Sequence, residues 1–267
     1  MRIASLHSYP IKGSHRNDHD VALVERHGLA GDRRWIVVDQ DGVGVTQRDT
    51  ALLSQLHVTP VGGGLVVRAA GMPDLRLAEP VDGPKEFVRV FKSKPQAPTR
   101  LADDGGWFAT FLGRPARIAW QEDPGGRPIL DAGRDDDRVS MADGYPMLIT
   151  TEASLAALND WLVEAGEEPV PMTRFRPNIV VAGAAPWAED GWPGRRLMIG
   201  EVPFRAARPC ARCLVTTIDQ ETGVKGSQPL KILGRHRNID GGLMFGLNLI
   251  PDAVGSLRVG DPVTLAS

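Results

Sequence analysis

Cysteine and tyrosine are scarce in this sequence. The 267 residues include only two of each, and aromatic residues make up 6% of the chain. Two cysteines cannot build the disulfide framework of a small secreted domain. No apolar run approaches the roughly 20 residues of a membrane-spanning helix, and residues 1–16 carry charges and Pro10 where a signal peptide needs an apolar segment. We therefore expect a cytoplasmic protein with no membrane partner.

Neither sign of charge dominates the sequence. The chain has 31 Lys and Arg against 33 Asp and Glu, a net charge of -2 at pH 7. Proteins that bind nucleic acid usually carry a basic excess, so no nucleic-acid partner is expected. A chain of 267 residues is near the size at which a single hydrophobic core stops growing. We place a domain boundary near Pro115, which gives domains at residues 1–115 and 116–267.

Short alternating runs separated by turn residues dominate the first half of the chain. The pair Asp41-Gly42 lies between two such runs and predicts a hairpin. Helical spacing is confined to a few segments, among them residues 107–112 and a helix capped by Thr151. The pattern predicts a mainly β protein with a few helices, of the α+β class, built as a barrel or sandwich. Its predicted strands cover residues 2–7, 21–23, 34–39, 44–47, 55–59, 65–69 and 86–92.

Several further segments carry specific expectations. Residues 92–99 indicate a connector, and residues 123–137 a long loop that is either the rim of a substrate cleft or disordered. Residues 175–181 predict a loop that runs into a strand, with Pro177 holding Arg176 in extended geometry. Further strands are predicted at residues 117–121, 215–218 and 243–250, and a closing hairpin at residues 260–263. A short helix is predicted from Pro229, with His236 facing solvent.

Both cysteines lie in one C-x-x-C motif, Cys210-Ala-Arg-Cys213, beside the positive charges of Arg208 and Arg212. Positive charge favours a thiolate over a thiol. The pair could be part of a closed zinc or iron–sulfur site, a redox dithiol, two buried apolar residues, or a motif in which one cysteine ligates a cofactor's metal.

The first two alternatives fit the surrounding sequence poorly. Four ligands would have to include scattered histidines, and the spacing of His15 and His19 from the cysteines matches no familiar zinc pattern. A thioredoxin-like dithiol should lie between a strand and a helix, whereas Pro209 precedes this motif and a β-branched run follows it. The residues alone leave the other two alternatives open.

Four short upstream segments combine glycine, charge and amide groups. Lys12-Gly13 follows the first predicted strand and suits an anion site, although such a pair is more often simply a turn. Arg33 lies in Gly31-Asp-Arg-Arg-Trp35, where a solvated charge cluster is the alternative. Arg176 and Asn178 flank Pro177 and would offer a guanidinium and an amide, or form a surface turn. Asp143-Gly144 precedes another predicted strand.

The cysteine segment and its upstream motifs together resemble one family. Residues 209–223 and 228–233 are similar to the core of the molybdenum cofactor sulfurase C-terminal (MOSC) proteins, specifically the branch that contains the mitochondrial amidoxime-reducing component. Residues 8–13, 31–35 and 174–181 resemble further motifs of that branch, in the same order along the chain. The resemblance implies two β-barrel-like domains, the second a MOSC domain, with a molybdenum cofactor bound between them.

The resemblance also implies roles for individual residues. Cys213, the cysteine followed by an aliphatic-Thr-Thr run, would be the metal ligand and catalytic residue, and Cys210 would be spare. The residues that would bind the molybdenum-pterin are Lys12, Gly13, Arg33, Asp143, Gly144, Arg176, Asn178, Arg212 and Asn248.

The activity implied by the resemblance is reduction of small N-hydroxylated compounds, N–OH to N–H plus water. The alternative is a non-catalytic carrier that holds sulfur or the cofactor on Cys213. The membrane anchor of the mitochondrial relatives and the C-terminal iron–sulfur domain of some bacterial relatives have no counterpart in this sequence. Since it contains no flavin or haem motif either, we expect a separate electron-donor protein, a reductase or a ferredoxin-like protein.

Overall fold

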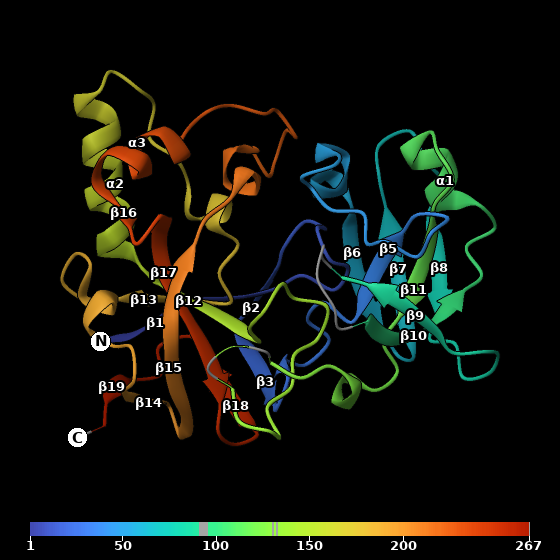
Figure 1. Cartoon of the computed structure of the whole chain (residues 1–267), viewed down its shortest axis with the longest axis horizontal. Helices are drawn as coiled ribbons and strands as arrows, with labels where there is room; N and C mark the ends of the chain where they lie inside the picture. Colours follow the sequence, from blue (N-terminus) through green and yellow to red (C-terminus); the bar gives the residue numbers. More distant parts are fainter. Residues whose placement is uncertain (91–95, 130, 132, 267) are drawn as a thin grey trace.

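The computed structural model describes residues 1–90, 96–129, 131 and 133–266, and it arranges them in two lobes (Figure 1). The large lobe comprises residues 1–29 and 139–266, and the small lobe comprises residues 35–120. Strands predominate in both, with three α-helices in the described part of the chain, so the predicted α+β class is confirmed. Both termini lie on the large lobe. No helix among the described residues is both long and apolar enough to cross a membrane.

One curved sheet forms the framework of the large lobe. Its strand order is β19-β14-β15-β17-β12-β13-β1-β2, with β16 paired to β17. Only the β12–β13 pair is parallel, and α2 (Glu152–Glu164) lies in the connection between these strands. The strands are β1 (Arg2–Ser8), β2 (Asn17–His19), β12 (Met147–Thr151), β13 (Ile179–Ala182), β14 (Arg196–Ile199), β15 (Val202–Ala211), β16 (Asn238–Ile239), β17 (Gly242–Pro251) and β19 (Val263–Leu265).

The first 29 residues belong to the large lobe. Strand β1 pairs with β13, so that Leu6 lies opposite Ile179. A separate three-stranded sheet joins β3 (Val21–Glu25) to β18 (Gly255–Arg258) and β4 (Gly28–Leu29). The chain therefore starts in the large lobe, passes through the small lobe and returns. The domain boundary near Pro115 stays a prediction.

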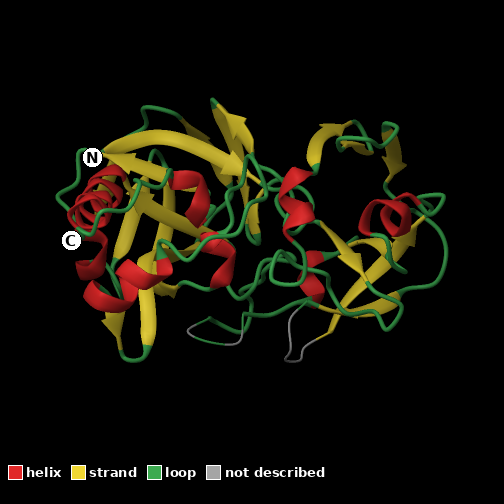
Figure 2. Ribbon diagram, turned by 90° about the horizontal axis from the view of Figure 1, so that it is seen from above, coloured by secondary structure: helices red, strands yellow, loops and turns green. Residues whose placement is uncertain are grey.

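The small lobe contains two sheets and a short helix (Figure 2). One sheet has the order β5-β11-β10-β9 and the other β6-β7-β8. The helix α1 (Trp107–Leu112) buries Trp107 and Phe108, as its apolar face predicts. The strands are β5 (Trp35–Val38), β6 (His57–Val61), β7 (Gly64–Arg68), β8 (Leu75–Ala78), β9 (Glu86–Arg89), β10 (Gln96–Ala102) and β11 (Arg117–Trp120).

Two predictions for the small lobe need correction. The Asp41-Gly42 turn is present, since the N–H of Asp39 donates to the carbonyl of Val43 at 2.9 Å, but residues 44–47 form no strand and take part only in an isolated bridge. Residues 96–99 form part of β10 and not a connector. Residues 92–95, the rest of that predicted connector, and residues 91–92 of the predicted strand 86–92 lie outside the described residues.

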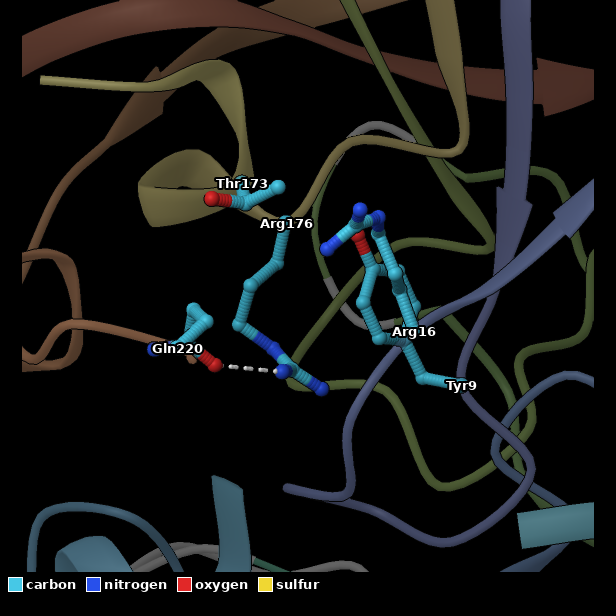
Figure 3. A pocket seen from close by; sticks show the side chains of 5 residues that line it. All are labelled: Tyr9, Arg16, Thr173, Arg176 and Gln220. Carbon is cyan, nitrogen blue, oxygen red and sulfur yellow. Dashed lines mark hydrogen bonds between the residues drawn. The ribbon is translucent and has the colours of Figure 1, made fainter. Parts of the chain in front are cut away.

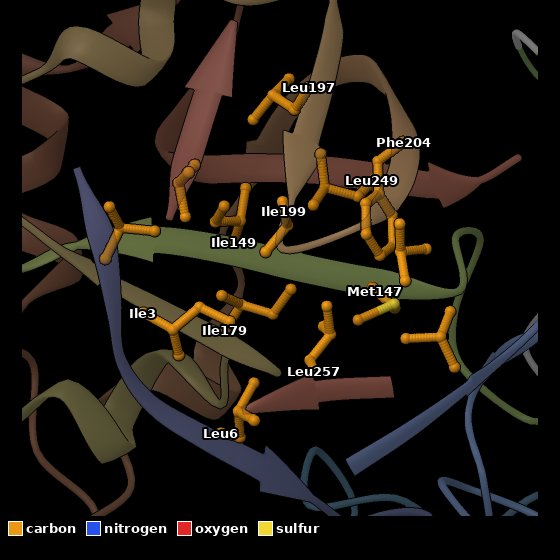
Figure 4. Close-up of a cluster of buried hydrophobic side chains, with 14 of the residues drawn as sticks. Ile3, Leu6, Met147, Ile149, Ile179, Leu197, Ile199, Phe204, Leu249 and Leu257 are labelled. Carbon is orange, nitrogen blue, oxygen red and sulfur yellow. The ribbon is translucent and has the colours of Figure 1, made fainter. Parts of the chain in front are cut away.

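The apolar core of the large lobe explains its strand pattern. Side chains from β1, β12, β13, β14, β15 and β17 meet on one face of the sheet (Figure 4). Every residue of β12 is buried, which is typical of a central strand covered on both sides. On the other face, Leu158 and Leu162 of α2 pack against α3 (Leu230–His236), which lies where a helix was predicted. His236 is exposed, as predicted, and stacks on Trp161.

The predicted cap of α2 is also present. The hydroxyl oxygen of Thr151 accepts from the N–H of Ser154, which satisfies one of the free donors in the first turn of the helix. This contact depends on residues three positions apart, and the sequence therefore predicts it directly.

Three predictions for the second half of the chain are wrong. Residues 215–218 do not form a strand, because the hydroxyls of Thr216 and Thr217 donate to carbonyls three residues earlier and favour the 3-10 helix η5 (Leu214–Thr217). Arg176 is not extended but left-handed, with φ 54 and ψ 49. Residues 260–263 do not close a hairpin, since β18 pairs with β3 and β19 pairs with β14.

The core predicts a clear difference between two truncations. Ile149 of β12 is fully buried, so Ile149→Ala should lower the free energy of unfolding by about 2–5 kcal/mol. Val163 of α2 is 59% exposed, and Val163→Ala should change it by less than about 0.5 kcal/mol. Urea unfolding measures both. Equal losses would contradict the position of β12 at the centre of the sheet.

Candidate cofactor site between the lobes

The C-x-x-C motif lies where β15 ends and η5 begins. Cys210 is the penultimate residue of β15. Cys213 caps η5, and its carbonyl accepts from the N–H of Thr216 at 3.0 Å. Both thiols are free and only partly buried. The interpretation as two buried apolar residues is therefore wrong.

The geometry also gives the cysteines no partners for a closed metal site. Across the described ranges, no three His, Cys, Asp or Glu side chains are arranged to hold a metal ion. His15 Nε2 lies 3.0 Å from Glu221 Oε2, and His19 Nε2 lies 2.7 Å from Ser8 Oγ. The histidines that could have supplied ligands thus contact other groups.

The two cysteines have different cationic neighbours. Arg212 donates from Nη1 to Cys210 Sγ at 2.9 Å and from Nη2 to the carbonyl of Phe175 at 2.6 Å. Its Nε is buried and finds no acceptor among the residues described here. Arg212 therefore contacts Cys210 directly. The cationic neighbour of Cys213 is a different guanidinium, which comes from the small lobe.

That guanidinium belongs to Arg48, which the sequence analysis missed. Arg48 donates from Nη2 to Asp143 Oδ2 at 2.8 Å. Burial acts to lower the pKa of Arg48, but the Asp143 carboxylate and the Cys213 sulfur outweigh burial and raise it. Arg48 follows a predicted hairpin in the sequence, and no local pattern distinguishes it from a solvated surface charge. Its role depends on partners 95 and 165 residues further along the chain.

Lys12 enters the site from the loop after β1. Its buried ammonium group donates to the carbonyl of Met141 at 2.9 Å and forms a short ion pair with Asp143. Burial lowers the pKa of Lys12 to about 8. Partial burial acts to raise the pKa of Asp143, but the charges of Lys12 and Arg48 hold that pKa below its ordinary value. Asp143 thus joins a cation from each lobe.

Gly13 and the side chain of Arg127 help to hold this group of charges in place. Gly13 has φ 89, and an added Cβ would lie 3.1 Å from a methyl group of Leu53, so this position favours glycine. Gly144 is exposed, with open space around it. Arg127, from the predicted loop at residues 123–137, donates to the carbonyls of Ser140, Ala142 and Asp143 and fixes the turn that carries Asp143.

A tyrosine between two arginines forms the inner wall of the site. The guanidinium carbons of Arg33 and Arg176 lie 4.5 and 4.1 Å from the centroid of the Tyr9 ring. Tyr9 donates its hydroxyl to the carbonyl of Pro177 at 3.0 Å, and burial raises the pKa of Tyr9 to about 12. The neutral phenol therefore separates the two cations.

Asn178 organises this wall from behind. Its amide nitrogen donates to the carbonyl of His7 at 3.1 Å and to Asp32 Oδ2 at 3.0 Å. Its amide oxygen accepts from the N–H of Leu148 at 3.1 Å and from Arg33 Nη1 at 3.3 Å. These contacts use the full hydrogen-bonding capacity of the amide. Asn178 therefore reaches a ligand only through Arg33.

Asn248 contacts the strand that leads into the C-x-x-C motif. It is on β17, opposite Arg208 of β15, and its amide nitrogen donates to the carbonyls of Arg208 and Pro209 at 3.2 and 3.4 Å. Asn248 thus positions the chain that enters the C-x-x-C motif.

A narrow pocket opens beside Tyr9 (Figure 3). The hollow lies among Tyr9, Arg16, Thr173, Arg176 and Gln220, and it has about 150 Å³ of empty space with its open mouth included but no enclosed space for a water molecule. Arg176 donates from Nη1 to the carbonyl of Ser14 at 2.8 Å and to Gln220 Oε1 at 2.9 Å. Burial lowers the pKa of Arg176 to about 10, and the group remains charged at neutral pH. Two guanidinium groups on one small pocket suit an anionic group of a ligand.

Comparison with known proteins identifies the family of this chain. The sequence matches the MOSC N-terminal beta barrel domain over residues 1–115 and the MOSC domain over residues 136–264. This chain belongs to the MOSC family. It is 34% identical to mitochondrial amidoxime-reducing component 1 of Homo sapiens and 32% identical to component 2 of the same species, in both cases over 98% of this chain and 82% of the relative.

Similarity extends to other relatives and to a solved structure. Component 2 of Bos taurus is 33% identical over 98% of this chain and 82% of its own. The crystal structure of the YUAD protein from Bacillus subtilis aligns with 98% of this chain and 93% of that chain, at 10% identity and a TM-score of 0.45.

The structure of this MOSC protein brings most of the predicted site residues together. Charged groups from both lobes converge between the Cys213 thiol and the Tyr9 ring, joined by the contacts described above. Asn178 lies behind this group and Asn248 lies to one side of it. The residues that converge are Lys12, Gly13, Arg33, Asp143, Gly144, Arg176, Arg212 and Cys213, with Arg48 as the addition.

The lowered pKa of Lys12 predicts how its effect on stability varies with pH. Below pH 8 both the folded and the unfolded chain carry the charge, and the full cost of burying it is present. Between pH 8 and 10.5 the unfolded chain binds more protons, so this cost is relieved as pH rises. The free energy of unfolding of the wild type relative to Lys12→Met should therefore increase from pH 7.5 to pH 10, by up to about 3 kcal/mol. Urea unfolding of both proteins at each pH measures it, and a constant difference would contradict the burial of a charged Lys12.

Proposed function

We propose that this protein binds a molybdenum cofactor between its lobes and reduces small N-hydroxylated compounds. In this reaction an N–OH group accepts two electrons and two protons and becomes N–H, with release of water. The observation that carries the proposal is the partly exposed thiol of Cys213 beside Arg48, near cations that come from both lobes. The names of the mitochondrial amidoxime-reducing components, to which the chain is similar, point to this substrate class.

The residues of this candidate site fit a molybdenum-pterin. Such a group is anionic, and it needs a soft sulfur ligand together with donors for its phosphate and its heterocycle. Cys213 offers the sulfur, and Lys12 and Arg176 offer buried positive charge. Arg212 keeps a buried Nε that no acceptor satisfies within the described part of the chain. A site with a surplus donor and a partly exposed thiol matches an anionic metal cofactor.

Each residue of the site would then have a defined role in binding the cofactor. Cys213 would ligate the metal, with the positive charge of Arg48 beside its sulfur. Lys12 and Arg176 would bind the anionic part of the pterin, with Arg33 held in place by Asp32 and Asn178. When bound, a molybdenum cofactor supplies the two-electron redox chemistry, and the protein supplies position and the exclusion of competing reactions.

The proposal includes a separate electron donor. The sequence has no flavin or haem motif, so electrons would come from a reductase or a ferredoxin-like protein. A cytoplasmic location belongs to the same proposal. Activity assays should therefore use a chemical reductant or an added donor protein and not NADH alone.

One observation also favours a non-catalytic carrier. A guanidinium beside a cysteine would stabilise a persulfide on that cysteine as well as a metal thiolate. A carrier would hold sulfur or the cofactor on Cys213 without turnover of an N-hydroxylated compound, and this difference separates the two functions.

Substitution of each cysteine alone tests the proposal. Cys213→Ser replaces a soft sulfur with a much poorer donor, so it should abolish N-reductive activity and change the EPR signal of the partly reduced metal. Cys210→Ser retains an acceptor for Arg212 and should leave both unchanged, at a stability cost of about 1 kcal/mol or less. Turnover of a benzamidoxime-type compound, metal content and EPR are measured side by side.

Three outcomes would contradict the assignment. Equal loss in the two variants would indicate that the cysteines act as a pair. Full activity in Cys213→Ser would remove the enzyme proposal. A wild type that holds molybdenum but does not turn over any N-hydroxylated compound would favour the carrier.

A further inference from the structure

Two buried glutamines join the lobes beside the site. Gln47 of the small lobe and Gln220 of the large lobe are 1% and 3% exposed. Gln47 Nε2 donates to Gln220 Oε1 at 2.9 Å, and Gln220 Nε2 donates back to Gln47 Oε1 at 3.0 Å. The two residues are 173 positions apart in the sequence. We propose that this reciprocal pair, the glutamine clasp, positions the two lobes around the cofactor site; the inference rests on the proposed cofactor binding.

The clasp has further partners on both sides of the site. Gln47 Nε2 also donates to the carbonyl of Gly13 at 2.7 Å, and Gln220 Nε2 to the carbonyl of Ile218 at 3.1 Å. Gln220 Oε1 accepts from Arg176 as well. Since both amides are buried, removal of either one leaves several polar groups without partners and without water. The clasp therefore connects the Lys12-Gly13 loop with Arg176.

The position of the clasp in the sequence links it to Cys213. Gln47 directly precedes Arg48, the small-lobe residue beside the Cys213 sulfur. Gln220 lies three residues after η5, which Cys213 caps. Figure 3 shows Gln220 and Arg176 joined across the pocket beside Tyr9. A change in the clasp would therefore alter the distance between Arg48 and Cys213 and the direction of Arg176 together.

Neighbouring contacts between the lobes are more exposed. Arg48 and Asp143 form an ion pair between the lobes at 2.8 Å, but the Asp143 side chain is 50% exposed. Exposed ion pairs contribute little to stability because solvent screens them. The clasp is buried and directional, so we assign the positioning role to Gln47 and Gln220 and no catalytic role to either.

Three variants and one control test the clasp. Gln220→Met keeps the length of the side chain and removes every polar contact. Gln220→Glu keeps acceptors for Arg176 and Gln47 and loses the two donations. Gln47→Met removes the polar contacts that the small-lobe glutamine makes with Gln220 and Gly13. The control is Asn159→Leu, because Asn159 forms a similar pair of amide contacts with Val170, at 3.1 and 2.9 Å, between α2 and the loop after it.

The first readout is the rate at which molybdenum leaves the purified protein during dialysis. Gln220→Met and Gln47→Met should each raise this rate about tenfold, the factor that corresponds to about 1.4 kcal/mol. The double variant should be no worse than either single one, because the two residues act as a unit. Gln220→Glu should lie between Gln220→Met and the wild type. Asn159→Leu should lower the unfolding midpoint and leave the rate unchanged.

The second readout needs no cofactor. In apo protein, Gln220→Met should speed hydrogen–deuterium exchange in residues 46–55 of the other lobe, whereas Asn159→Leu should not. Unchanged exchange there, or molybdenum loss at the wild-type rate, would overturn the clasp. A wild type without molybdenum would instead contradict the proposed function, and exchange in the apo protein would still decide whether the clasp joins the lobes.

Discussion

Buried guanidinium groups at the junction of the lobes are the constraint on which the site depends. Burial of a charged group is costly unless its hydrogen bonds are satisfied and opposite charge lies nearby. Arg33 meets this requirement through Asp32 and Asn178, and Arg176 through carbonyl and amide oxygens. Tyr9 separates the two cations with an uncharged ring. The loops that leave β1, enter β5 and enter β13 must therefore meet at one place.

The same group of buried cations leaves excess positive charge, which would suit an anionic ligand. Asp143 is shared by Lys12 and Arg48, so one carboxylate faces two cations. The fully buried Asp32 neutralises only part of the charge on the opposite wall. The excess positive charge lies next to the Cys213 sulfur, which supplies a ligand that the surrounding arginines do not. The proposed anion binding and metal ligation would thus be properties of one arrangement, to which both lobes contribute.

The sequence predicts local features of this fold well and long-range ones poorly. The Asp41-Gly42 turn and the Thr151 cap depend on residues a few positions apart, and both are present. The left-handed Arg176 contradicts the preference of a residue before proline, because its contacts with the carbonyl of Ser14 and with Gln220 override that preference. Arg48 has no local signal at all, since its partners come from the other lobe. Family resemblance supplied most of the site residues, and tertiary contacts supplied the rest.

Elemental analysis of protein purified from a host that makes the molybdenum cofactor tests the central claim most directly. We expect molybdenum in stoichiometric amount with the chain, because the cations from both lobes and the Cys213 thiol would together bind the cofactor and retain it through purification. Protein that is folded but contains no molybdenum, whether metal-free or loaded with zinc, would contradict the account.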